Sequence, residues 1–123
     1  MREIKFRGLD ANGIMRYGRL SQDKPNETIY YKEYSQIICW DDSNIPVSNV
    51  SIGQFTGLKD KNGKEIYEGD IFKLGVEKEV FEVRFEHGCF MAFCNGKQYG
   101  LIGELQICFI DIIGNIYQNA ELL

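Results

Sequence analysis

The sequence predicts a mainly β protein made of antiparallel hairpins, and three observations lead to that fold class. Segments that alternate apolar and charged residues are typical of half-buried strands, and Glu79–Glu86 is the clearest of them. Asn-Gly pairs, which favour tight turns between strands, stand at positions 12–13, 62–63 and 95–96. The composition, with 7 Tyr, 8 Phe, 13 Gly and only 2 Pro, also favours strands and turns over helices.

The N-terminal part of the chain predicts one clear hairpin. Glu3–Arg7 alternates apolar and charged residues, which indicates a half-buried strand. The Asn-Gly pair at 12–13 is expected at the turn into a second strand, Ile14–Leu20. The polar residues of Ser21–Thr28 predict a loop after it.

The stretch from Gln54 to Ile71 carries the strongest turn signal. Asp60-Lys61-Asn62-Gly63 stands between apolar anchors and predicts a hairpin turn, with Gly63 in the left-handed conformation. Glu68-Gly69-Asp70 predicts a second turn into the next strand, where the Asp70 carboxylate is expected to accept hydrogen bonds from local amides.

Two parts of the sequence echo each other. Phe6–Gly13 parallels Phe55–Gly63 with one inserted residue, and both end in Asn-Gly. Two hairpins built in the same way explain the echo, and a duplicated subdomain is the alternative explanation. Neither copy has the ligand spacing and final Glu of a twelve-residue calcium loop.

The C-terminal half predicts a succession of short antiparallel strands joined by turns at His87-Gly88 and Asn95-Gly96. The expected strands are Ile71–Leu74, Glu79–Glu86, Cys89–Cys94, Lys97–Ile102 and Leu105–Ile113. In Glu79–Glu86, Phe81, Val83 and Phe85 share one face. The last strand is nearly all apolar, so its Asp111 is expected at a sheet edge or bonded to backbone.

This pattern suits a small barrel or strongly curved sheet, similar to a Src-homology-3-type barrel, because closure removes exposed edges. The 123 residues are enough for one domain. We expect that domain to contain an N-terminal β subdomain, residues 1–53, and a small β-barrel, residues 54–123, packed against each other.

Charge and hydrophobicity exclude several classes of protein. The net charge of −4 argues against a dedicated non-specific nucleic-acid binder, whose affinity comes largely from phosphate neutralisation. No stretch approaches the roughly 20 apolar residues of a membrane span, and the N-terminus lacks the apolar segment of a signal peptide. The sequence therefore predicts a cytoplasmic protein, with its 4 Cys reduced.

No constellation of residues indicates catalysis or metal binding. A zinc site made of His87, Cys89, Cys94 and Cys108 would lack the short paired spacings of structural zinc sites, so these cysteines are expected to be small buried apolar side chains. His87 is the only histidine and lies in a predicted turn, and no phosphate-binding glycine motif is present. We expect no enzyme, no cofactor and no metal.

Two groups of residues are candidate binding surfaces. Aromatic residues gather between positions 30 and 40, and core or interface packing is their expected use, with base stacking the alternative. This candidate interaction surface consists of Tyr30, Tyr31, Tyr34 and Trp40. Lysines surround the turn near position 62, where the favoured reading is a solvated hairpin tip and phosphate contact the alternative. These lysines are Lys59, Lys61 and Lys64.

Three segments carry a resemblance to a known family. The Gln54–Ile71 stretch, the opening Met1–Arg7 with Asp10 soon after, and the ending Ile113–Leu123 are similar to motifs of the YopX-like family. These proteins occur mainly in bacteriophages and prophages, which implies the cytoplasm of a bacterial host cell. The family has no accepted catalytic residues, so the resemblance transfers none. Gly8-Leu9 replaces a usual Ala-Trp pair, and Ala120 stands where Pro is common.

The leading functional hypothesis is a non-enzymatic protein-interaction module that binds a host or phage protein, with self-association into a homo-oligomer as an option. It depends on a chain rich in aromatic and aliphatic residues without a catalytic constellation. The alternative is a small nucleic-acid-binding β-barrel that uses the three lysines of the central turn.

Overall fold

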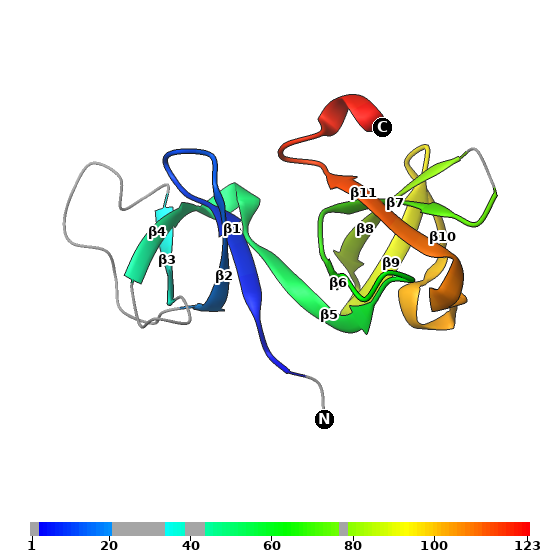
Figure 1. Ribbon diagram of the computed structural model, residues 1–123, viewed down its shortest axis with the longest axis horizontal. Helices are drawn as coiled ribbons and strands as arrows, with labels where there is room; N and C mark the ends of the chain where they lie inside the picture. The colour runs from blue at the N-terminus through cyan, green and yellow to red at the C-terminus, as the bar shows by residue number, and fades with distance from the viewer. Residues whose placement is uncertain (1–2, 21–33, 39–43, 77–78) are drawn as a thin grey trace. The chain divides into compact units, whose positions relative to one another are not determined.

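The computed structural model describes residues 3–20, 34–38, 44–76 and 79–123, and it confirms the mainly β class. The chain divides into two compact units, Met1–Phe55 and Thr56–Leu123. Strand β5 (Gly53–Lys59) passes from the first unit into the second (Figure 1).

The N-terminal unit is an antiparallel sheet in the order β4-β3-β2-β1-β5. Its elements are β1 (Phe6–Leu9), β2 (Met15–Leu20), β3 (Tyr34–Ile38), β4 (Asn44–Ser48), the 3-10 turn η1 (Asn49–Ser51) and the beginning of β5. The predicted first hairpin is confirmed, because β1 pairs with β2 from Phe6↔Gly18 to Leu9↔Met15. The Asn-Gly pair lies in the loop between them, with Gly13 at a φ of 76°.

The first strand differs from the prediction in its bounds and in the face that it buries. It begins at Phe6 and not at Glu3, and its charged residues are inward: Lys5 is 8% exposed and Arg7 2%, whereas Ile4 is 67% exposed. Lys5 tolerates burial because its ammonium lies 5.3 Å from the centre of the Phe55 ring and 3.7 Å from the Glu3 carboxylate. The alternating pattern of Glu3–Arg7 thus identified a strand correctly, but the charged residues of this segment are the ones that face inward.

The C-terminal unit contains a five-stranded antiparallel sheet in the order β10-β9-β8-β7-β11, and β6 pairs with the second half of β5. Its elements are β6 (Glu65–Tyr67), β7 (Asp70–Leu74), β8 (Val80–Glu86), β9 (Cys89–Cys94), β10 (Lys97–Leu101), η2 (Ile102–Glu104), η3 (Ile107–Phe109), β11 (Ile110–Asn115) and η4 (Ala120–Leu122). Strands β10 and β11 stand at the two edges of this sheet, so the described strands form a sheet with two edges and not the closed small barrel that the sequence predicted.

The core of the C-terminal unit lies on one face of that sheet. Its buried members are Ile66, Phe72, Phe81, Val83, Ala92, Ile102, Ile110 and Ile112. Phe72 and Phe81 stack with their ring centres 5.3 Å apart. The predicted inward face of β8 is confirmed for Phe81 and Val83, each 1% exposed. Phe85 continues the same face past the rim of the core, where it is 45% exposed and packs on Phe90.

The predicted turns of this unit are confirmed. His87-Gly88 joins β8 to β9 with φ angles of 52° and 79°, and Asn95-Gly96 joins β9 to β10 with 53° and 76°. Positive φ at both central residues is the turn geometry that matches the twist of a two-stranded hairpin. Gly69, with φ 92°, turns β6 into β7 as expected.

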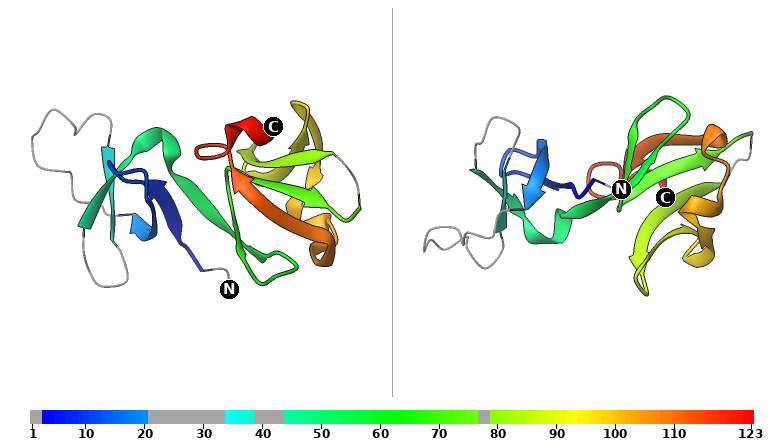
Figure 2. Two further views of the ribbon diagram at one scale, coloured as in Figure 1. Left: turned by 45° about the horizontal axis from the view of Figure 1, so that its top comes forward. Right: turned by 90° about the horizontal axis from the view of Figure 1, so that it is seen from below.

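The predicted strand Leu105–Ile113 is wrong in its first half. That part of the chain must cross from β10 at one edge of the sheet to β11 at the other, so it cannot stay in a ladder (Figures 1 and 2). It turns twice instead, with Leu105 N donating to Ile102 O at 3.1 Å and Phe109 N to Gln106 O at 2.9 Å. Only from Ile110 does the chain pair with β7. Asp111 then lies on an edge strand, as expected.

Candidate interaction surfaces

The hairpin tip Asp60–Lys64 between β5 and β6 is organised by one carboxylate. Asp60 Oδ1 accepts hydrogen bonds from the backbone amides of Asn62 and Lys64, both at 2.9 Å. Gly63 N donates to Asp60 O at 3.0 Å, and Asp60 N donates to Lys64 O at 2.8 Å. Asp60 is only 5% exposed although its neighbours in the tip are exposed. The tip is therefore a rigid turn built around a buried acid.

The same tip is docked on the outer side of β11. Asp60 Oδ2 accepts a hydrogen bond from Ile112 N at 3.1 Å, and Lys61 N donates to Ile110 O at 3.0 Å. Asn62 Nδ2 and Lys61 Nζ reach the two carboxylate oxygens of Asp111 at 3.3 and 3.7 Å. These contacts occupy backbone groups that β11, as an edge strand, would otherwise present to another chain.

Of the three predicted lysines, Lys61 and Lys64 lie on this exposed tip, and Lys59 is the exposed last residue of β5 beside it. Their charge is largely balanced, because Lys61 pairs with Asp111 and because Asp60 and Glu65 are in the same hairpin. A patch of this kind is a weak phosphate site, since affinity for phosphate depends on net positive charge.

The predicted aromatic surface lies mostly beyond what the structure describes. Tyr30, Tyr31 and Trp40 are outside the described residues. Tyr34 begins β3 and pairs with Ser48 of β4, and its side chain also lies outside the description. The hypothesis that these four residues form an interaction surface stays a prediction.

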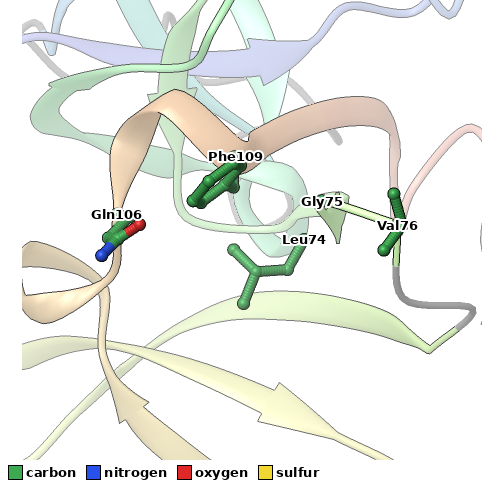
Figure 3. A pocket seen from close by; sticks show the side chains of 5 residues that line it. All are labelled: Leu74, Gly75, Val76, Gln106 and Phe109. Carbon is green, nitrogen blue, oxygen red and sulfur yellow. The ribbon is translucent and has the colours of Figure 1, made fainter.

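An apolar groove lies on the C-terminal unit, where the end of β7 meets η3. It has a volume of about 430 Å³ and is lined by Leu74, Gly75, Val76, Gln106 and Phe109. In Figure 3, the side chains of Leu74 and Phe109 lie between those of Gln106 and Val76. Val76 is fully exposed and Phe109 is 50% exposed. Large apolar side chains that remain in solvent at one place typically mark a contact surface.

The backbone fixes the two walls of this groove to each other. Gly75 N donates to Phe109 O at 2.8 Å, and Gly75 has a φ of 62°, a conformation that favours glycine. A Cβ at this position would lie 3.8 Å from the Phe109 ring. The groove was not predicted from the sequence, because Gly75 and Val76 fall between two expected strands and Phe109 falls within the expected strand Leu105–Ile113. Only the turn at η3 brings the two segments together.

A second hollow, of about 350 Å³, lies over the outer side of β8 and β9. It is lined by Glu79, Val80, Glu82, Arg84, Phe93, Asn95, Gly96, Leu122 and Leu123. The Arg84 guanidinium lies 4.4 Å from the centre of the Phe93 ring and donates to Glu82 Oε1 at 3.1 Å. Glu82 already neutralises Arg84, so this hollow offers little net attraction for an anion.

The residues weighed for zinc binding are not brought together as a ligand set. In the described part of the chain, no group of three or more His, Cys, Asp or Glu side chains is placed to hold a metal ion. Cys89 and Cys108 are exposed, so the expectation of buried cysteines is wrong for these two positions, whereas Cys94 is half-buried and packs against the core of the unit. Cys89 begins β9 at the rim of the sheet and Cys108 lies in η3, where the chain leaves the core.

The hairpin tip Asp10–Ile14 of the N-terminal unit repeats the bonding of the Asp60–Lys64 tip. Asp10 Oδ1 accepts from Asn12 N at 2.8 Å and from Ile14 N at 3.0 Å, while Oδ2 accepts from Arg16 Nε at 2.8 Å. The hydrogen bond from the Ile14 amide has the largest effect on the pKa of Asp10, and the one from Arg16 the next largest. Together they hold this pKa below its usual value of 3.8. Oδ2 of Asp10 therefore bonds within its own hairpin, whereas Oδ2 of Asp60 bonds to the distant strand β11.

The closing segment of the chain is held by Asn115. Its Oδ1 accepts from Tyr117 N at 3.0 Å and from Gln118 N at 2.9 Å, and its own N donates to Asn119 Oδ1 at 3.1 Å. Ile116 N donates to Gly69 O at 2.9 Å, which ties this turn to the one before β7. At that earlier turn, Asp70 Oδ2 accepts from Tyr67 N at 2.7 Å, so the expected local bond of Asp70 is confirmed.

Among the residues that the structure describes, no helix has the length and apolar character needed to cross a membrane.

Comparison with known proteins identifies the family and no biochemical activity. No curated protein matches the chain. One similar solved structure is the crystal structure of protein EF1440 from Enterococcus faecalis, with 26% sequence identity and a TM-score of 0.52, covering 100% of this chain and 99% of that one. The model described as YopX protein matches residues 5–123, nearly the whole length. The chain therefore belongs to the YopX family.

Proposed function

We propose that this chain is a non-enzymatic protein-interaction module that contacts its partner through the apolar groove between β7 and η3. The observation that carries the proposal is the exposure of Val76 and Phe109, two large apolar side chains that line the same groove. The family resemblance supports a phage or prophage origin, and with it a host or phage protein as the partner.

The dimensions and lining of the groove fit one or two apolar side chains of a partner. Its volume of about 430 Å³ falls within the range of ligand pockets, about 300–1,000 Å³. Leu74, Val76 and Phe109 supply apolar walls, and Gln106 is the one polar side chain among the described residues of the lining. Full burial of a Val or Phe side chain contributes about 1.5–3 kcal/mol, so two such anchors give a substantial share of a micromolar affinity.

The experiment compares two matched substitutions of exposed valines. Val76→Asp places a charge in the groove, whereas Val50→Asp makes the same change at an exposed position of the N-terminal unit. Neither side chain is in a core, so both variants should fold. Tagged wild type and both variants are used to capture proteins from a bacterial host lysate, and mass spectrometry identifies what is retained.

We expect wild type and Val50→Asp to retain a protein from the lysate that Val76→Asp does not retain. Size-exclusion chromatography with light scattering tests for a homo-oligomer with the same variants. If the chain self-associates through the groove, its molar mass exceeds that of the monomer, and only Val76→Asp reduces it. A monomer that retains nothing contradicts the proposal, and so does a partner that Val76→Asp binds unchanged.

Nucleic-acid binding is the second candidate, and the exposure of Lys59 and Lys64 on the two sides of one hairpin is the observation in its favour. A gel-shift assay at low salt with single- and double-stranded probes separates the two functions, because phosphate contacts are strongest there. Our proposal expects no shift. A shift that the double variant Lys59→Ala/Lys64→Ala loses, and that Lys97→Ala on β10 keeps, would instead establish the second candidate.

A further inference from the structure

The chain contains three Asn-Gly pairs, and the structure gives their glycine amides different surroundings. Asn-Gly is the dipeptide most prone to deamidation in water, because a glycine amide is the least hindered nucleophile toward the preceding side chain. The pairs are Asn12-Gly13, Asn62-Gly63 and Asn95-Gly96. All three asparagines are exposed, so water reaches each of them.

Two of the glycine amides are held by hydrogen bonds. Gly13 N donates to Asp10 O and Gly63 N to Asp60 O, each at 3.0 Å. The Asn62 side chain is held as well, since its Nδ2 donates to Asp111 Oδ1 at 3.3 Å. In the described part of the chain, the Gly96 amide donates to no acceptor, because the ladder of β9 and β10 begins at the pair Lys97↔Cys94.

We propose that Asn95 is a site of spontaneous deamidation, and that it reacts fastest of the three asparagines in the folded protein. The Gly96 nitrogen attacks Asn95 Cγ, forms the C–N bond of a succinimide ring and loses its proton. The side-chain nitrogen leaves as ammonia. Water then opens the ring at either carbonyl, which gives aspartate or isoaspartate.

The reaction changes a surface that the structure defines. Asn95 lines the hollow over β8 and β9, where Glu79 and Glu82 are already present with Arg84. An aspartate at this position makes the hollow more acidic. An isoaspartate also lengthens the backbone within a two-residue turn, so it disrupts the turn geometry that pairs β9 with β10.

The test is peptide mapping by mass spectrometry after incubation of the folded chain at mildly alkaline pH. A hydrogen bond donated by the glycine amide slows attack by that nitrogen about fivefold, because the bond must break before the nitrogen can react. We therefore expect Asn95 to deamidate about fivefold faster than Asn12, and Asn62 to be slowest. In urea, where the chain is unfolded, the three rates should become similar because each asparagine precedes glycine.

Asp111→Ala provides a matched variant. It removes the acceptor of the Asn62 side chain and leaves the Gly63 amide bonded, so the rate at Asn62 should rise toward that at Asn12, with Asn95 unchanged. A folded chain in which Asn95 reacts no faster than Asn12 overturns the proposal. An order of rates that is the same in urea as in the folded state also overturns it.

Discussion

Replacing Asp60 by alanine tests whether the Asp60–Lys64 tip holds β11. The wild-type carboxylate accepts three backbone amides, from Asn62, Lys64 and Ile112. The first two belong to exposed residues, so water can replace the carboxylate there. Ile112 is 9% exposed, and its amide would be left without an acceptor in the interior.

The expected loss of stability is dominated by that buried amide. An unsatisfied buried donor costs about 1–3 kcal/mol, and the loss of the two turn bonds adds about 1 kcal/mol. We therefore expect Asp60→Ala to destabilise the C-terminal unit by about 2–4 kcal/mol. Asp10→Ala removes the same two turn bonds in the N-terminal unit and the ion pair with the partly exposed Arg16, but it leaves no buried amide without an acceptor, so its effect should be smaller.

Native-state hydrogen exchange is the suitable assay, because a chain with two compact units need not unfold in one step. Asp60→Asn provides the control. It keeps an oxygen for the turn but turns an NH₂ group toward Ile112 N, so exchange at Ile112 should accelerate while the Lys64 amide stays protected. Undiminished protection of Ile112 in Asp60→Ala, or equal losses of stability in Asp60→Ala and Asp10→Ala, would refute the reasoning.

Two further predictions concern other turns. Asp10 has a lowered pKa, so its stabilising contribution is present above the unfolded-state value and is lost as the pH falls through the folded-state value. The difference in Tm between wild type and Asp10→Asn should be largest near neutral pH and shrink as the pH falls below the usual Asp value of 3.8, and a constant difference would contradict this. Gly114→Ala places a Cβ 2.6 Å from Asn119 Oδ1 and 2.9 Å from Asn119 Cβ, which should cost about 1–3 kcal/mol in urea denaturation. Gly103→Ala meets open space and should change stability by less than about 0.5 kcal/mol, so equal effects of the two substitutions would contradict the steric reasoning.

The parts of the fold that the sequence predicted well are those that depend on short-range chemistry. The strands β7, β8 and β9 and the turns at 87–88 and 95–96 follow from alternation and from residues that accept positive φ. The inward orientation of Lys5 and Arg7 was not predictable in this way. For Lys5 it depends on the Phe55 ring, which lies some fifty positions later in the chain.

The apolar groove was not predictable for a related reason. Its walls come from Leu74–Val76 and from Gln106–Phe109, and neither segment has an unusual composition. The apolar run from Leu105 predicted a strand because nothing local marks the point where the chain must cross the sheet. The order of β10 and β11 at opposite edges imposes that crossing, and strand order is a property of the whole sheet.

The two aspartate-centred tips show why a motif that identifies a family need not be a binding site. In both tips, one carboxylate oxygen accepts hydrogen bonds from the amides two and four residues later, so the same Asp-x-Asn-Gly sequence makes the same turn. The tips differ in the second oxygen, which binds Arg16 in one and Ile112 N in the other. Local chemistry therefore explains the repeated sequence without requiring a duplication. The bond to Ile112 N gives Asp60 a structural role. The Asp60–Lys64 tip covers the edge of β11, so another chain cannot pair with that strand. By this reasoning, a partner is better sought at the groove beside η3, where apolar side chains remain exposed.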